Sequence, residues 1–400
     1  MKKIIIFFAL VFPFISAAQS KNYRLYGHVY TVDNLTYTGY ITWGKSNMYW
    51  IDLFRADKPN NPYTHYFKSE ERLIFRNNGQ DSPIPPTHLF SCRFGNIKSI
   101  QPLSNSKAEL EIKDGNTIQL NRGNYNDIGT AIGIYSPDNT YATIRWDKIT
   151  KVEFCSPDND SIAPEKNQPI CGIIKTDQGI YKGFITWDKD EKTAEATLDG
   201  QSQNGYRNLP FEVIQKITKN GNGCKVVLKN GKEYDMWGTN DVNTANRGII
   251  VNMPNIGRVT IPWKNFEIFE ATDIQDINIL SYEDFGQPQR IYGEVTTRKG
   301  ETYNGYMAYD LDEAMNFEIL DGNNDNIIYE IPFKFVSSIE PKNYKYSFVT
   351  LTKGGSLSLG DSPDVNNENS GMLVFPDTGI PTYIPWKAVS YTHLTLPTIR

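Results

Sequence analysis

The sequence predicts an all-β protein made of three tandem copies of one unit, and two observations carry this prediction. Short runs of β-branched and aromatic residues are bounded by Gly, Asn and Asp, and Phe, Trp and Tyr make up 13% of the 400 residues. Such runs are typical of strands and turns, and no long segment keeps the 3.6-residue apolar period of a helix. The second observation is internal similarity at three places along the chain.

Each predicted unit opens with a half, half A, whose two strands carry glycines 11 or 12 residues apart. The matching stretches are Tyr26–Trp43, Cys171–Trp187 and Tyr292–Tyr309. In all three the second glycine stands in a Tyr-x-Gly-aromatic sequence. Chance does not produce this spacing three times with matching flanks, so we interpret half A as a repeat.

A second half, half B, follows each half A. Asn240–Ile249 matches Pro363–Met372, and an Ile-Pro-Trp tripeptide begins 13 residues after the glycine of each. The first copy is more divergent and closes with Ile144-Arg145-Trp146. The sequence therefore predicts that every unit pairs one half A with one half B.

The three units are expected at 22–155, 170–270 and 290–390, with an insertion near 55–89 in the first. Each half has about 50 residues, a size at which a single hydrophobic core is marginally stable. Pairing the two halves buries more surface, which explains why the unit repeats as a pair. Gly-containing polar turns between the strands predict tight hairpins.

The opening of half A in the third unit resembles the small SH3-like and Sm-like barrels. Arg298–Tyr306, followed by Asp310, Asp312 and the Met315-Asn316 pair, is similar to the first Sm motif. The resemblance implies tandem small β-barrel modules, six in all. No Sm-type RNA-contacting motif closes any module, so the resemblance does not imply RNA binding.

The two ends of the chain are unlike the rest. Residues 1–18 have two lysines, an apolar run and small residues before Gln19, which is the form of a secretory signal peptide. The run is shorter than the roughly 20 residues that span a bilayer, and no comparable run follows. We therefore expect a mature chain without a transmembrane span in the periplasm, on the cell surface or outside the cell. Residues 391–400 break the preceding pattern, and we interpret them as a non-native tail.

Composition excludes several classes of function. The formal net charge is −5, and a mildly acidic chain repels phosphate backbones, so nucleic acid is not expected as a partner. Four dispersed histidines without CxxC or HxxxH spacing do not predict zinc. No Ser-His-Asp or Cys-His arrangement and no phosphate-binding glycine loop is present. Cys155 and Cys171 flank the linker between the first two units and could form a disulfide after export, or remain free thiols.

Oxygen-rich loops predict a calcium site, with no other cofactor expected. Asp188–Glu191 and Asp310–Glu313 place carboxylates close together after a strand, as calcium prefers. The repeated Asx residues are the more specific candidates: Asp241, Asn243, Asn246, Asp364, Asn366 and Asn369. Asx side chains that cap their own backbone would explain the same residues without a metal.

Aromatic residues of the first unit predict a ligand surface. The stretch around Tyr49 and Trp50 is dense in aromatics, and the insertion adds Tyr63, His65 and Tyr66. Long loops grafted onto a repeat often carry binding residues. The aromatics that recur in all units instead predict core packing: Trp43, Trp187, Trp263 and Trp386.

The function that fits these observations is an exported, non-enzymatic binding or structural protein of the cell envelope or surface. Its partner would be a protein or a glycan. Two alternatives remain open, a secreted hydrolase of polysaccharide or peptide and a calcium-stabilised structural protein. A cleft with two carboxylates about 5–10 Å apart would favour the hydrolase.

Overall fold

The computed structural model describes residues 22–66, 88–138, 140–158 and 166–395, and within them the protein is all-β with antiparallel strand pairs. The all-β prediction is confirmed. None of the sheets closes into a barrel, so the prediction of tandem SH3-like or Sm-like barrels is not confirmed. The physical reason is strand sharing: the first two strands of each half A pair with strands of half B, so the halves cannot close separately.

The described strands fall into three sets of ten, which we call segments 1, 2 and 3. Segment 1 contains β1 (Tyr26–Thr31), β2 (Thr36–Trp43), β3 (Leu53–Lys58), β4 (His88–Arg93), β5 (Ile97–Ser104), β6 (Lys107–Ile112), β7 (Thr117–Asn121), β8 (Ile132–Tyr135), β9 (Tyr141–Ile144) and β10 (Ile149–Phe154). Segment 2 contains β11 (Ile170–Thr176), β12 (Ile180–Thr186), β13 (Thr197–Ser202), β14 (Gly205–Pro210), β15 (Ile214–Asn220), β16 (Gly223–Leu228), β17 (Glu233–Met236), β18 (Ile249–Met253), β19 (Gly257–Ile261) and β20 (Phe266–Ala271). Segment 3 contains β21 (Tyr292–Thr297), β22 (Thr302–Tyr309), β23 (Ile319–Asn324), β24 (Ile327–Pro332), β25 (Val336–Pro341), β26 (Tyr346–Leu351), β27 (Ser356–Gly360), β28 (Met372–Phe375), β29 (Thr382–Ile384) and β30 (Val389–Thr395).

Short 3-10 helices connect some of the strands. They are η1 (Thr64–Tyr66), η2 (Phe94–Asn96), η3 (Trp146–Lys148), η4 (Phe211–Val213), η5 (Asn240–Val242), η6 (Ile274–Asp276), η7 (Tyr282–Phe285), η8 (Phe333–Phe335), η9 (Pro363–Val365) and η10 (Trp386–Ala388). In the described part of the chain, no helix has the length and apolar character needed to cross a membrane.

Strand pairing follows the same order in all three segments. Segment 1 forms one sheet in the order β4-β3-β7-β6-β5-β10-β1-β2-β8-β9. The corresponding pairs recur in segments 2 and 3, with one exception. β13 and β14 form a separate two-stranded sheet, whose backbone pairing with β17 is replaced by an isolated bridge from Gln201 to Trp237. The insertion of the first unit lies between β3 and β4, and residues 67–87 of it lie outside the described residues, as do 1–21. Of the terminal stretch, Tyr391–Thr395 belongs to β30.

The repeated glycines are explained by close packing around the first two strands of each segment. Gly172 and Gly183 lie opposite each other on β11 and β12. A Cβ on Gly183 would lie 2.3 Å from the carbonyl oxygen of Asn252 in β18, which no real Cβ tolerates. The pairs in segments 1 and 3 are equally crowded. Only glycine therefore lets the flanking strands approach.

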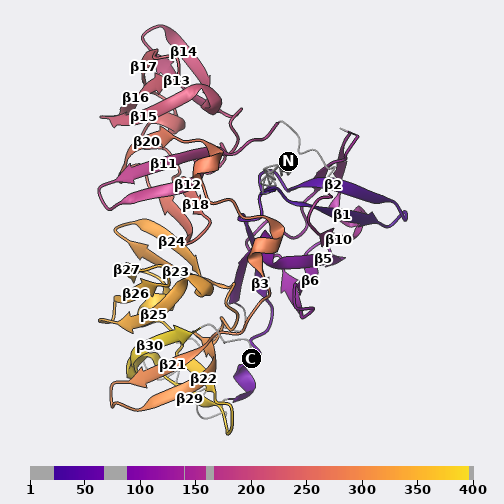
Figure 1. The fold of residues 1–400 in the computed structure, drawn as a ribbon, viewed down its shortest axis with the longest axis vertical. Helices are drawn as coiled ribbons and strands as arrows, with labels where there is room; N and C mark the ends of the chain where they lie inside the picture. Colours follow the sequence, from indigo (N-terminus) through magenta and orange to yellow (C-terminus); the bar gives the residue numbers. More distant parts are fainter. Residues whose placement is uncertain (1–21, 67–87, 139, 159–165, 396–400) are drawn as a thin grey trace, which may run out of the picture.

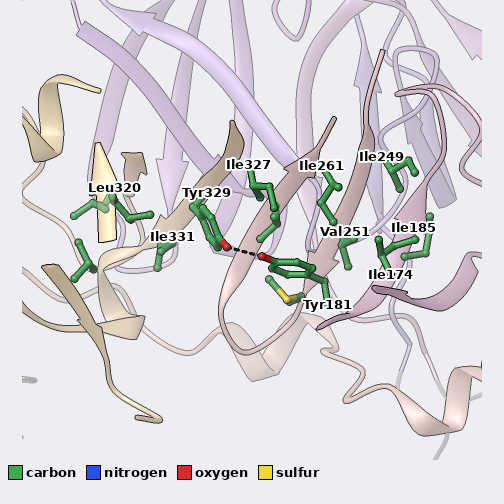
Figure 2. Packing of buried hydrophobic residues seen from close by; sticks show 14 of the residues in the cluster. Ile174, Tyr181, Ile185, Ile249, Val251, Ile261, Leu320, Ile327, Tyr329 and Ile331 are labelled. Atoms are coloured by element: carbon green, nitrogen blue, oxygen red, sulfur yellow. Dashed lines mark hydrogen bonds between the residues drawn. The ribbon is translucent and has the colours of Figure 1, made fainter. Parts of the chain in front are cut away.

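Segments 2 and 3 share one sheet and one core. β19 pairs with β24 in antiparallel register, and this pairing is the seam between the two segments. Figure 2 shows isoleucine, leucine and valine side chains from both segments packed along the seam, with the hydroxyls of Tyr181 and Tyr329 hydrogen-bonded at 2.6 Å. The seam therefore combines backbone pairing with a continuous apolar core.

Segment 1 lies beside the seam (Figure 1), and its core also takes in Cys171 and Phe184 of segment 2 and Phe317 of segment 3. The chain between segments 2 and 3 crosses it: the Tyr282 ring lies 4.7 Å from that of Trp50, and the Tyr282 hydroxyl donates to the carbonyl of Ile97. Arg93 of β4 donates to the carbonyls of Met253 and Pro254 at 2.9 and 2.8 Å. Segment 1 is thus attached by side chains and not by a shared sheet.

Candidate functional site

In every segment one aspartate between the seventh and eighth strands accepts a backbone N–H of the third strand. In segment 2, Asp241 accepts the backbone N–H of Asp199 at 2.8 Å, and its carbonyl accepts the Trp187 indole N–H at 2.8 Å. Asp127 and Asp364 accept the corresponding N–H groups in the other segments. The recurrence of an aspartate here is thus explained by backbone capping within the fold.

The Asx residues predicted to bind calcium use their oxygens in the same way. Asn243 and Asn246 accept the backbone N–H groups of Ala245 and Gly248. Asn366 and Asn369 accept those of Glu368 and Gly371, and Asp364 that of Asp321. These bonds match the capping interpretation, and calcium binding at these residues stays a prediction.

The acidic loop of segment 2 brings three carboxyl groups together. Ligand atoms of Asp188, Asp190 and Glu191 lie within 4.8 Å of one another. Arg247 already contacts this cluster, with Nη2 2.8 Å from Asp188 Oδ2 and a second ion pair to Asp190. A guanidinium therefore supplies the positive charge that a cation would bring.

A cleft of about 740 Å³ lies between segments 1 and 3. Its walls come from the start of the insertion, from the β6–β7 hairpin, from the chain that leads into β21 and from the acidic loop of segment 3. The residues on the two sides of the cleft are at least 169 positions apart in the sequence, from Gln119 to Pro288, so no local pattern could have identified it. A smaller pocket of about 440 Å³ lies in segment 1, beside Tyr30 and Glu153.

Lys58 closes the base of the cleft. Its Nζ lies 2.8 Å from Asp312 Oδ1 and 2.5 Å from Glu318 Oε1, and all three side chains are nearly buried. Burial favours the neutral amine, but the charges of Glu318 and Asp312 outweigh it and raise the pKa of Lys58. Burial likewise opposes ionisation of Asp312, but Lys58 and His88 hold its pKa below the usual value. Lys58 and Asp312 therefore both favour their charged forms at the base of the cleft.

The insertion is anchored to segment 3 beside this network. Asn61 donates to the carbonyl of Leu311 at 2.9 Å and accepts the backbone N–H of Tyr63 at 2.8 Å. Its Nδ2 lies 2.7 Å from His88 Nε2. These contacts hold Tyr63 in the cleft wall, where burial raises the pKa of its hydroxyl to about 12.

The structure separates the residues predicted to bind a ligand. Tyr63 lines the cleft. Tyr66 is exposed, with its ring 5.4 Å from that of Phe375, and His65 stacks on Tyr66 at 3.9 Å, outside the cleft lining. Tyr49 and Trp50 have no exposed surface, because they pack in the core of segment 1, so they cannot contact a ligand in this structure. The interpretation of Trp43, Trp187, Trp263 and Trp386 as core agrees with their burial.

Arg290 forms the opposite rim of the cleft and had no signal in the sequence. Its guanidinium lies 4.6 Å from the centre of the Tyr306 ring and 5.4 Å from that of Phe375. Within the described residues no carboxylate pairs with it. The rings fix the guanidinium while its edge stays open to solvent. All four cysteines are free thiols, so no disulfide staples the first linker.

No family model matches the chain, and comparison with curated proteins and with solved structures finds no significant match. The functional argument therefore depends on the geometry of the cleft alone.

Proposed function

We propose that the chain is an exported, non-enzymatic binding protein of the cell envelope or surface, and that its ligand is a glycan held in the cleft between segments 1 and 3. The observation that carries the proposal is the lining of this cleft. We also propose that the three segments are copies of one repeat unit, as their common strand order supports. Repeats of this kind build extended surfaces without any catalytic demand.

The lining suits a ligand with many hydroxyl groups and apolar C–H faces. Asn60, Asn116 and Gln119 offer amide donors and acceptors. Tyr63 and neighbouring prolines offer flat apolar surface, on which a sugar ring can lie. Since Lys58 is neutralised by two carboxylates, the base of the cleft does not select an anionic ligand.

The hydrolase alternative meets a specific obstacle. Asp312 and Glu318 both line the cleft and both contact Lys58 Nζ, at 2.8 and 2.5 Å, so their oxygens are close enough for a glycosidase pair. Such a pair needs one protonated acid and one ionised partner. Lys58 stands between the two carboxylates and holds down the pKa of Asp312, so this acid is not available as a proton donor. Because the Lys58 ammonium group contacts both carboxylates, we favour binding over cleavage.

Titration calorimetry tests the proposal with a panel of short oligosaccharides of N-acetylglucosamine, glucose and mannose. We expect one of them to bind, and Tyr63→Ala or Asn116→Ala to weaken it about tenfold, or about 1.4 kcal/mol. Tyr141→Ala is the matched control, because Tyr141 is an exposed tyrosine that does not line the cleft. The proposal fails if no oligosaccharide binds, or if the bound one is cleaved on prolonged incubation.

A further inference from the structure

Within the described residues of segments 2 and 3, two strands have an open edge: β14, which pairs with β13 in a separate two-stranded sheet, and β29, which pairs with β28 in the sheet shared by segments 2 and 3. β14 occupies in segment 2 the place that β24 has in segment 3, and β29 occupies the place of β19. Figure 1 shows β14 at the upper end of the long axis and β29 at the lower end. A second copy of the chain could therefore add β29 to β14 with the geometry of the internal seam.

Three seam residues make the contacts that would have to be reproduced. Arg258 faces Glu330 in the register, and their side chains form an ion pair at 3.1 Å. Tyr329 is 4% exposed and bonds to Tyr181. Arg55 of segment 1 adds a second guanidinium to Glu330. The seam thus depends on matched charges and on one buried hydroxyl pair.

The register identifies the residues at the same places on the open edges. Pro210 of β14 is equivalent to Pro332 of β24, because each pairs with the first residue of the preceding strand. Counting back from these prolines, Asn208 is equivalent to Glu330 and Arg207 is equivalent to Tyr329. Ile384 of β29 is equivalent to Ile261 of β19, because each pairs with the first residue of the preceding strand. Counting back from these isoleucines, Pro381 is equivalent to Arg258. All three positions that carry the seam contacts are therefore changed on the open edges.

Each change works against pairing. The ion pair cannot form between Pro381 and Asn208. Arg207 would bring a guanidinium into the place where Tyr329 is buried, and an unpaired buried charge is strongly unfavourable. Pro381 has no backbone N–H to donate to an added strand. Charged residues and proline are common means by which natural sheets block their edges.

We infer that Arg207, Asn208 and Pro381 keep a second copy of this chain from joining head to tail at edges that otherwise fit it. Restoring the seam residues on both edges should convert the protein into a linear assembly. Restoring them on one edge should not.

Sedimentation velocity of the full mature chain tests this inference. The wild type, Arg207→Tyr/Asn208→Glu and Pro381→Arg should each sediment as monomers over a wide range of concentration. An equimolar mixture of the two variants should form a dimer, because each supplies one restored edge. The combined variant should form oligomers that lengthen with concentration.

Two controls keep the outcome clear. Pro381→Ala restores the N–H without the charge, so its mixture with Arg207→Tyr/Asn208→Glu should associate more weakly than the Pro381→Arg mixture. Pro381→Glu places like charges opposite each other and should give no association. Polymerisation of the wild type would overturn the inference, as would a folded combined variant that stays monomeric while its far-UV circular dichroism matches the wild type.

Discussion

Segments 2 and 3 meet backbone to backbone, whereas segment 1 meets both of them through buried side chains. At the seam, β19 and β24 continue one sheet, and the core runs across the boundary. At segment 1 the contacts are between side chains, and they include two lysine–carboxylate pairs. Lys192 of segment 2 lies 2.8 Å from Asp52, and Lys58 of segment 1 lies 2.5 Å from Glu318 of segment 3.

The acidic residues of these two contacts, Asp52 and Glu318, lie at equivalent positions in segments 1 and 3. Asp52 accepts the backbone N–H groups of Met48 and Tyr49, and Glu318 accepts those of Ala314 and Met315. Each acid therefore shapes its own loop and also holds a lysine from another segment. Segments with the same strand order are thus joined in two ways, through a shared sheet or through buried charged side chains. The cleft lies at a junction of the second kind, between segments 1 and 3.

The largest expected effect comes from removing a lysine of segment 1. Lys58→Met would remove the lysine charge from the buried carboxylates of Asp312 and Glu318, which typically lowers the free energy of unfolding by about 3–5 kcal/mol. Urea unfolding followed by tryptophan fluorescence measures the loss. Lys98→Met is the control: its pair with Glu111 is solvent-exposed, so no measurable change is expected. Equal effects of the two variants would show that the buried network does not attach segment 1.

Glu330→Gln tests a residue that belongs to both junctions. Its carboxylate pairs with Arg258 in the seam and with Arg55 of segment 1. The amide keeps the shape but leaves two largely buried guanidiniums without a counter-charge, so we expect a loss of about 3 kcal/mol. If the loss is additive with that of Lys58→Met in the double variant, the two junctions are independent. A strong non-additive term would instead mean that they unfold together.

Tyr329→Phe breaks a seam contact without changing charge. It removes the bond to the Tyr181 hydroxyl, and the expected loss is about 1 kcal/mol. A double-mutant cycle with Tyr181→Phe measures the pair itself. Tyr141→Phe, at an exposed tyrosine of β9, should have no effect. A coupling near zero in the cycle would mean that the seam depends on backbone pairing and packing alone.

The smallest expected effect is a pH dependence of stability that distinguishes segment 2 from segment 1. Glu191 takes the place of Asn47, which donates to Asp127 in segment 1. Burial, together with Asp190 and Asp241, raises the pKa of Glu191 to about 8. The folded chain therefore binds this proton more tightly than the unfolded chain. The resulting stabilisation is present below the ordinary glutamate pKa of 4.5 and is lost as pH rises to about 8.

Thermal unfolding across this pH range measures the effect. Glu191→Gln should reduce the fall in unfolding midpoint between pH 5 and pH 8, because the amide can donate as Asn47 does. The reverse change, Asn47→Glu, should make the fall steeper. Unchanged slopes in both variants would rule out this carboxyl group as the source.

The sequence by itself indicated a strand-rich structure and the residues that recur at matching positions in the three segments. The glycine pairs could be recognised in the sequence because the eighth and tenth strands of each segment leave no space for a Cβ. The aspartates could be recognised because each accepts a backbone N–H of the third strand of its segment. Local constraints of this kind make the same residue types recur along the sequence. The recurring Asp and Asn residues also suggested calcium, since the residue types that cap a backbone N–H are the ones that bind this cation.

Only the tertiary structure decided how the strands and segments are joined. The halves were expected to close into barrels, but the sheets remain open because strands of both halves interleave. The cleft residues Lys58, Glu318 and Arg290 carried no signal, since partners about 250 residues apart leave no periodicity along the chain. Tyr49 and Trp50 looked like a ligand surface by composition, yet packing buried them. Local rules determine which strands form, whereas long-range contacts determine which surfaces remain open to a partner.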